Sequence, residues 1–440
     1  MRLYYTVGMP FFELKSKSKL KEKKSILKLE NKNANSILFS CIFLSLTFLN
    51  YLSDWWVFKV SGTSEVKIRE SSDFADLMWI KSFVACYRKV GESVYLYDEN
   101  FPCHTGYMYG STLIKFFEIV KLDSVSILGI GLVLTIFFCI GLGIIASNIE
   151  ADKGFHKLFI VSVLFSPGIW LLLERGNLDI LIFLLLLVGT QLFSKGNEIS
   201  GILLIALSAL FKFYSLPVLL TLIFITSKRI TRIVGTLVTL LVIPKVFLDI
   251  TSITNPGFPS TWYISFGIES IGLYLNLALE QFNQNRFILN GLEVKLLGCI
   301  TLILAVILFS KFGKIQIKSI SKALEISPDF AAWSFLKNSF WIFGTTSISC
   351  YLAGMSYDYR LSFLAVAGLS LIALAKNKRI SISCLPVLLI IATWCSGSFF
   401  PSTSLVLSGL IQLVGDVAFF ILSVFFILTF INEIKLKINK

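Results

Sequence analysis

The sequence predicts an all-α polytopic membrane protein, and three observations indicate this class. Hydrophobic residues make up 55% of the 440 residues and charged residues only 15%, with a mean hydropathy of +0.78. A polar surface cannot cover so apolar a chain in water. Apolar runs of about the 20 residues that a spanning helix needs recur from Ser36 to the C-terminus. Basic residues also concentrate between alternate runs, as expected for loops on one side of a membrane.

Basic tails flank a single membrane domain. The N-terminal tail, residues 1–35, contains "KSKSKLKEKKSILKLENKN" and could begin a secretory signal. However, the apolar run 36–52 is followed by "SDWWVFK" rather than by a small-residue cleavage site, so we expect an uncleaved first span with its basic flank in the cytoplasm. The membrane domain covers 36–431, and residues 432–440 form a basic C-terminal tail. The net charge of +13 indicates membrane lipid rather than nucleic acid as a partner.

About 10–13 spanning helices are expected, and an assignment with an even number of spans places both termini in the cytoplasm. Most basic residues then lie inside, including "SKRITR" (227–232) and "KNKR" (376–379). The long first outer loop, 53–123, holds ten acidic and eight basic residues. The expected spans lie near 36–52, 124–147, 158–173, 178–193, 199–212, 214–227, 232–248, 294–310, 338–354, 361–375, 380–396 and 409–430.

Two segments leave the topology open. Residues 199–227 are too long for one ordinary span and too short for two, and "ALFKFYSLPVLL" places Lys212 in their middle. We expect two short helices that dip into the membrane and turn back near 211–217, with Lys212 facing a polar cavity or an anion. Residues 261–279 are aromatic and only partly apolar, so they form either a span or an interfacial helix.

Unusual polar residues collect on the outer side of this topology. Charges at helix ends are often only interface anchors, and Arg175 or Arg360 alone would simply extend to the interface. Together, however, Arg175, Lys212 and Arg360 are expected to form a cationic rim at the depth of a lipid headgroup. The segments that carry the polar residues are "SSDFADLMWI" (71–80), "ERGNLD" (174–179), "KFY" (212–214) and "MSYDYR" (355–360).

The order of these segments resembles glycosyltransferase family 87, a family of integral-membrane transferases with the GT-C fold. The resemblance covers roughly residues 36–430. Its elements are an acidic first outer loop with "DF", then "ERGNLD" opening a long aliphatic helix, then "LFKFYSLP", and finally "YDYR" opening a late helix. One feature departs from the family, which usually has Pro directly after the Tyr. Here Ser215 follows Tyr214, and Pro217 comes three residues after the Tyr.

The resemblance implies a GT-C-like helical bundle and a hexosyltransferase. The donor would be a mannose-like hexose on polyprenyl phosphate, and the acceptor a glycan or glycolipid outside the cytoplasmic (plasma) membrane. A lipid phosphate is already a leaving group. Transfer therefore needs a carboxylate to deprotonate the acceptor hydroxyl and cations to stabilise the departing phosphate. A single base of this kind suggests direct displacement with inversion.

The catalytic base is predicted to be Asp73, which matches the family's "DF" position, with Asp76 in reserve one helical turn later. Alternatively, Asp73 only caps a helix expected over 74–90. The donor phosphate is predicted to bind Arg175, Lys212 and Arg360. Four further residues, Glu174, Asn177, Tyr214 and Asp358, are predicted to bind substrate.

Several of these assignments have a structural alternative. Asp358 either binds a sugar hydroxyl or orients Arg360, and Glu174 beside Arg175 is open to the same two interpretations. Aromatic residues near the outer side either stack on sugars or anchor the interface. They are Tyr97, Tyr107, Tyr109, Trp262 and Tyr263.

Other kinds of site are not expected. The sequence has no phosphate-binding glycine-rich loop followed by Lys and Ser/Thr, so a nucleotide-driven motor is not expected. The only histidines, His104 and His156, fall on opposite sides, so neither a metal nor another cofactor is predicted. Cys86 and Cys103 lie in the outer loop, where they either form a disulfide or stay free thiols.

The main alternative function is a transporter or flippase of lipid-linked saccharides. A transporter should carry polar residues through the centre of the bilayer. Most of the expected spans here are aliphatic in their middles and polar at one end, which favours chemistry at an interface. A scaffold within a polysaccharide assembly complex is the third possibility.

Overall fold

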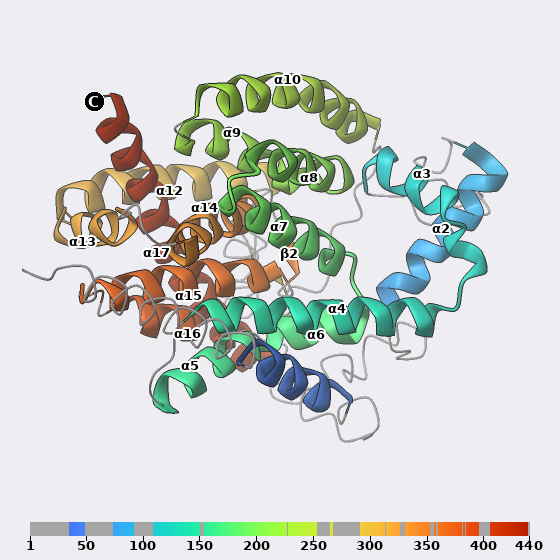
Figure 1. Ribbon diagram of the computed structural model, residues 1–440, viewed down its shortest axis with the longest axis horizontal. Helices are drawn as coiled ribbons and strands as arrows, with labels where there is room; N and C mark the ends of the chain where they lie inside the picture. Colours follow the sequence, from blue (N-terminus) through green and yellow to red (C-terminus); the bar gives the residue numbers. More distant parts are fainter. Residues whose placement is uncertain are drawn as a thin grey trace, which may run out of the picture.

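The described part of the chain is almost entirely helical (Figure 1). The computed structural model describes residues 35–48, 74–91, 109–149, 154–226, 228–252, 265–266, 291–312, 314–325, 331–352, 356–357, 360–380, 382, 384–395 and 405–438. Within these ranges one sheet pairs two-residue strands, β1 (Ser265–Phe266) and β2 (Ser356–Tyr357), in antiparallel register. Apart from this pair, the predicted all-α class is confirmed for the described residues.

Helices occupy the positions of the apolar runs, and three more lie outside those runs, over 75–90, 111–119 and 314–324. After a helix over 35–48 they are α2 (Ala75–Val90), α3 (Ser111–Ile119), α4 (Ile127–Asn148), α5 (Gly154–Leu164), α6 (Pro167–Arg175), α7 (Asp179–Ser194), α8 (Glu198–Phe211), α9 (Leu216–Ile225), α10 (Arg229–Ser252), α12 (Gly291–Phe312), α13 (Lys314–Leu324), α14 (Ala331–Leu352), α15 (Leu361–Asn377), α16 (Leu385–Trp394) and α17 (Leu405–Ile438). Single 3-10 turns lie at η2 (Leu122–Ser124) and η3 (Phe213–Ser215).

Three described helices, α4, α10 and α17, are long and apolar enough to cross a membrane. The pair α5 and α6 makes a fourth if both belong to one span, although their axes differ by 43°. Pro167 begins α6. Proline disfavours the α conformation in the residue before it, so the apolar run expected as one continuous span over 158–173 is bent there. Several other apolar helices have 10–17 residues. These features make the chain a helical, membrane-associated protein.

The two segments with open topology differ from each other. Residues 199–227 contain the expected pair of short helices, α8 and α9, and Lys212 lies between α8 and η3. Residues 265–266, in contrast, are a strand, so a helix running through 261–279 is wrong at these two positions. The strand pairs with β2, which belongs to the "MSYDYR" segment.

Several helices expose large apolar side chains. On α10, Leu240, Leu241 and Phe247 are each more than half exposed, and α12 exposes Leu304 and Leu308 in the same way. Soluble monomers rarely leave such wide apolar patches in water. These side chains are expected to contact lipid tails.

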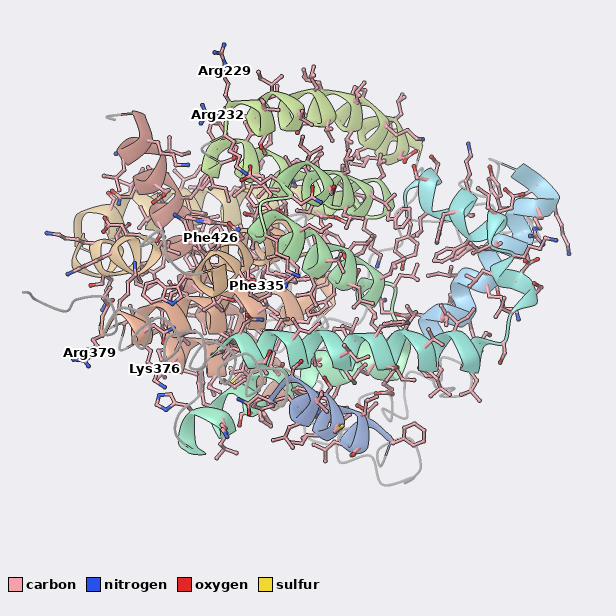
Figure 2. The ribbon with its side chains drawn as sticks, in the orientation of Figure 1. Arg229, Arg232, Phe335, Lys376, Arg379 and Phe426 are labelled. Carbon is pink, nitrogen blue, oxygen red and sulfur yellow. The ribbon has the colours of Figure 1, made fainter. Side chains whose placement is uncertain are left out.

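Basic side chains lie at the end of the bundle away from α2 and α3 (Figure 2). Helices α2 and α3 lie at the right edge of Figure 1. Figure 2 places four labelled basic residues at the other side of the same view, with Arg229 and Arg232 near the start of α10 and Lys376 and Arg379 near the end of α15. Arg360 caps the start of α15. The 17 residues of this helix separate its start at Arg360 from its end near Lys376 by about 25 Å, at 1.5 Å per residue.

Helices α7 and α8 pack closely along their length. A Cβ added at Gly201 of α8 would lie only 2.7 Å from the carbonyl oxygen of Gly189 in α7, so glycine permits this approach. The contact is near the end of α7 and the start of α8, whereas Asp179 at the start of α7 meets Lys212 at the end of α8. The two helices are therefore antiparallel neighbours, and their polar ends coincide.

Candidate functional site

A network of charged and polar side chains joins the ends of five elements at the α2 side of the bundle. It connects α2, the turn between α6 and α7, the turn after α8, η3 and the start of α15. We call it the ionic cluster. Its members are Asp76, Arg175, Asn177, Asp179, Lys212, Tyr214 and Arg360.

The turn between α6 and α7 is built on Gly176. This residue ends α6 in the left-handed conformation, with φ 57°, and its N–H donates to the Leu173 carbonyl at 3.1 Å. Glycine adopts this conformation without steric cost, which is why it commonly ends helices. The next residue, Asn177, accepts a hydrogen bond from the Asp179 N–H on its side-chain oxygen at 2.9 Å. The turn therefore orders Arg175, Asn177 and Asp179 in one compact unit.

Phe74 packs the start of α2 against the turn between α6 and α7. Its ring fills the space in front of both Gly176 and Gly131 of α4, where an added Cβ would lie 2.6 Å from the ring atoms. The Phe74 N–H also donates to the Glu174 carbonyl at 2.8 Å. Asp76 follows two residues later in the first turn of α2, so the packing of Phe74 fixes where this carboxylate lies.

Asp76 is held by two residues. The Arg175 guanidinium donates from Nε at 2.8 Å and from Nη2 at 2.5 Å, both to Oδ1. The side-chain amide of Asn177 donates to Oδ2. Because both carboxylate oxygens are engaged, Asp76 is arranged to orient Arg175 rather than to receive a proton from an acceptor.

Asp179 is the centre of the ionic cluster and is fully buried. Its Oδ1 accepts from Lys212 Nζ at 2.6 Å and from the Tyr214 hydroxyl, and its Oδ2 accepts from Arg360 Nε at 3.1 Å. Lys212 Nζ also donates to Asn177 Oδ1 at 3.2 Å. This last bond joins the Asp179 half of the network to the Asp76 half.

Side-chain exposure increases from the centre of the ionic cluster to its edge. The side chains of Asp179 and Lys212 are 0% and 2% exposed. Asp76 is 12% exposed, Arg360 18% and Arg175 20%. The five charged side chains carry two negative and three positive formal charges, so the joined set has a net charge of +1. The two arginines bring that charge to the accessible edge, where a small anion would be attracted.

Aromatic rings cover two of the three basic residues of the ionic cluster. The Tyr109 ring centroid lies 4.6 Å from Lys212 Nζ, and the Tyr214 ring centroid lies 5.0 Å from Arg360 Cζ. Such contacts stabilise a cation that is partly removed from water. Tyr109 is thus a neighbour of Lys212, whereas Tyr107 lies outside the described residues.

The structure brings together six residues that the sequence singled out for a site: Asp76, Arg175, Asn177, Lys212, Tyr214 and Arg360. Lys212 differs from the expectation, because it lies at the buried centre and not at the rim. The anion that it faces is Asp179. Glu174 is buried on α6 and joins the turn through its backbone carbonyl. Asp73 and Asp358 lie outside the described residues.

Sequence reasoning missed the role of Asp179 as the shared partner of two cations and a tyrosine. The signal was present, since an acidic residue directly before an apolar run of helical length needs a partner if it is buried.

Among the expected cysteine partners, Cys86 is disulfide-bonded, whereas Cys103 lies outside the described residues. No cluster of three metal-ligating side chains occurs in the described ranges.

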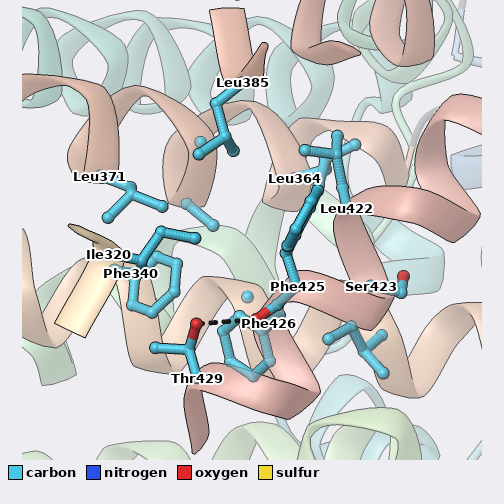
Figure 3. A pocket seen from close by; sticks show the side chains of 14 residues that line it. Ile320, Phe340, Leu364, Leu371, Leu385, Leu422, Ser423, Phe425, Phe426 and Thr429 are labelled. Carbon is cyan, nitrogen blue, oxygen red and sulfur yellow. Dashed lines mark hydrogen bonds between the residues drawn. The ribbon is translucent and has the colours of Figure 1, made fainter. Parts of the chain in front are cut away.

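A small cavity lies elsewhere in the bundle (Figure 3). It has a volume of about 40 Å³ and is lined mainly by apolar side chains of α14, α15 and α17, with single contributions from α13 and α16. The labelled lining includes Phe340, Leu364, Leu371 and Phe426. No member of the ionic cluster lines the cavity. The cavity is therefore not the candidate site.

Comparison with known proteins finds no matching family model, no matching curated protein and no matching solved structure. The chemistry of the site therefore depends on its own residues. Arginines at the edge of a buried, ion-paired centre can hold an anion with fixed geometry. The ionic cluster thus has the features of an anion-binding site at one end of a helical bundle.

Replacing Gly176 with alanine is expected to destabilise the protein by about 1–3 kcal/mol. The new Cβ would meet the Phe74 ring and would also be strained at positive φ. Thermal unfolding of the purified variant in detergent measures the effect. Gly196→Ala is the matched control, because Gly196 also has positive φ but its Cβ would meet only Lys228 Nζ, at 4.0 Å. Equal losses for the two variants would show that the Phe74 contact adds nothing.

Proposed function

We propose that the protein is a membrane glycosyltransferase of the GT-C type, similar to glycosyltransferase family 87. In this proposal about 10–13 helices span the cytoplasmic membrane, and both termini face the cytoplasm. The enzyme moves a mannose-like hexose from a polyprenyl-phosphate donor to a glycan or glycolipid. The ionic cluster is the donor site and lies at the extracytoplasmic face.

The observation that supports this proposal best is the position of the ionic cluster. It gathers three basic residues at the end of the bundle opposite Arg229, Arg232, Lys376 and Arg379 (Figures 1 and 2). Basic residues at loop ends favour the cytoplasmic side, so in this proposal the end with these four residues faces the cytoplasm and the ionic cluster faces outward. A lipid phosphate is held at headgroup depth by its own tail. Cations fixed at the ends of α6 and α15 match that depth.

Each residue has a role in the proposed reaction. The acceptor oxygen attacks the anomeric carbon as the bond from that carbon to the phosphate oxygen breaks, which inverts the configuration. Asp73 takes the hydroxyl proton, since Asp76 is committed to Arg175 and Asn177. The lipid phosphate leaves with one more negative charge, which Arg175 and Arg360 stabilise. Lys212 holds Asp179 and, through it, Arg360.

The sidedness can be tested by cysteine labelling in cells. The proposal predicts that Ser124→Cys reacts with an impermeant maleimide in intact cells, whereas Arg379→Cys reacts only after the membrane is opened. Both positions are exposed; Ser124 lies in η2, which packs against α2 and α3, whereas Arg379 lies near the end of α15 on the other side of Figure 2. The six free cysteines are first replaced, and Cys86 is kept because it is disulfide-bonded. Labelling of Arg379→Cys in intact cells, with protection of Ser124→Cys, would reverse the topology.

The activity itself can be tested with purified protein in lipid nanodiscs. Radiolabelled polyprenyl-phosphate hexoses are incubated with membrane glycolipid acceptors, and a new glycoside is sought by chromatography. The transferase forms a glycosidic bond and releases the lipid phosphate. The loss of product in an Asp73→Asn variant that still folds would support the base, with turnover falling by about two orders of magnitude or more.

A transporter or flippase of lipid-linked saccharides is the second candidate. Unlike most of the expected spans, α14 buries hydroxyl side chains in its middle, including Thr345, Thr346 and Ser347, and Thr345 shares a hydrogen bond of 3.1 Å with Thr221 of α9. Small hydroxyl residues also hold membrane helices together, so this row does not require a pathway. Movement of a fluorescent lipid-linked sugar across proteoliposomes, without a new glycoside, would favour the transporter.

A further inference from the structure

A second polar contact site lies beside the ionic cluster, where α3 begins. The N–H of Gly110 donates to the carbonyl of Phe211, the last residue of α8, at 3.4 Å. A Cβ at position 110 would lie 2.3 Å from the Leu210 carbonyl oxygen. Only glycine allows the chain to approach the end of α8 this closely. The start of α3 is therefore pressed against the residues that immediately precede Lys212.

Asp249 of α10 holds α3 in this place. Its Oδ2 accepts the backbone N–H of Ser111, the first residue of α3, at 3.1 Å. Its Oδ1 accepts from Lys245 Nζ at 2.7 Å, and Lys245 also donates to the Ser111 hydroxyl. The first N–H groups of a helix have no partner inside the helix, and a carboxylate near them is favourable. Asp249 supplies from another helix the acceptor that a local N-cap would provide, since Gly110 has no side chain to do so.

Tyr109 precedes this docked glycine. Its ring lies over Lys212 Nζ at 4.6 Å, and Lys212 follows Phe211, whose carbonyl receives the Gly110 N–H. The same backbone contact therefore sets the start of α3 and the ring of Tyr109 relative to Lys212. A shift of α3 away from α8 would carry the ring with it.

We infer that Asp249 is a positioning residue, which fixes the start of α3 so that Tyr109 covers Lys212 at the centre of the ionic cluster. Tyr109 then shields the Lys212–Asp179 ion pair from water and keeps Lys212 directed at Asp179, the carboxylate that also orients Arg360. The docking is independent of the proposed function. Its consequence for sugar transfer rests on that function, because it acts on the arginine assigned to the donor phosphate.

Chemical labelling of Lys212 tests the docking directly. The intact protein in nanodiscs is treated with a water-soluble acetylating reagent, and modification of Lys212 is measured by mass spectrometry. Lys212 is 2% exposed in the native protein, so it should react slowly. Asp249→Ala and Tyr109→Ala are each expected to raise its labelling severalfold, whereas Tyr109→Phe keeps the ring and should behave like the native protein.

Matched variants distinguish this positioning role of Asp249 from a general loss of packing around α3. Asp249→Asn keeps an oxygen for the Ser111 N–H and should label less than Asp249→Ala. Asp123→Ala removes the partially exposed Arg88–Asp123 pair, which joins α2 to η2 in the same region, and should leave Lys212 labelling unchanged. Hydrogen exchange in the peptide over 109–119 should rise in Asp249→Ala and not in Asp123→Ala.

Three outcomes would overturn the inference. They are unchanged labelling in Asp249→Ala, unchanged labelling in Tyr109→Ala, and equal labelling in Asp249→Ala and Asp123→Ala. The turnover assay is a separate readout. If Asp249→Ala exposes Lys212 and the native enzyme is active, kcat should fall and Asp249→Asn should recover part of it. If the native protein forms no glycoside, the proposed function fails while the labelling result still decides the docking.

Discussion

Asparagine in place of Asp179 is expected to cost about 3–5 kcal/mol of stability, the loss seen when one partner of a buried ion pair is removed. The substitution keeps the shape of the side chain but removes its charge. Lys212 would then remain buried without a compensating anion, and Arg360 would lose its acceptor at 3.1 Å. Exposed ion pairs behave differently, because water already solvates both groups.

Thermal unfolding of the purified protein in detergent measures this effect. Asp123→Asn is the control, since its partner Arg88 is 34% exposed, and the expected loss is about 1 kcal/mol or less. The double variant Asp179→Asn with Lys212→Met should be more stable than Asp179→Asn alone, because it removes the uncompensated lysine charge. A loss for Asp179→Asn no larger than that of Asp123→Asn would show that Lys212 is not held as a buried cation.

The positions of many helices could be predicted from apolar runs alone. The runs 124–147, 178–193 and 361–375 correspond to α4, α7 and α15, each within a few residues. This agreement has a physical basis, since the length of an apolar run sets the length of helix that can be removed from water. The same reasoning overlooked the break at Pro167, although proline inside an apolar run is the commonest cause of a bend.

The contacts within the ionic cluster were harder to predict from the sequence. The sequence shows that Arg175, Lys212 and Arg360 interrupt apolar runs, but not which acid each one meets. Lys212 and Asp179 are 33 residues apart, and Arg360 and Asp179 are 181 apart, so their contacts depend on how α7, α8 and α15 pack. The burial of Lys212 follows from the same packing.

Two substitutions at Arg360 test the proposed phosphate site. Arg360→Gln should lower both kcat and kcat/KM for a polyprenyl-phosphate hexose by about 10²-fold or more, the effect typical of removing one donor to a developing negative charge. Arg360→Lys should fall between Arg360→Gln and the native enzyme, because lysine keeps the charge but loses the planar fork. Lysine also cannot reproduce the stacking of the guanidinium over the Tyr214 ring.

Two further variants accompany those at Arg360. Arg88→Gln is a control outside the ionic cluster, and Arg175→Gln tests the second arginine of the cluster. Arg88 pairs with Asp123 outside the ionic cluster, so Arg88→Gln should leave turnover unchanged. Arg175 pairs with Asp76 at the accessible edge, so Arg175→Gln should impair turnover as Arg360→Gln does. Unfolding measurements on each variant separate loss of chemistry from loss of folded protein. If glutamine at both positions left kcat and the donor KM unchanged, the arginines would be anchors at the membrane interface, and the polar turn between α6 and α7 would serve only to join two helices at the water boundary.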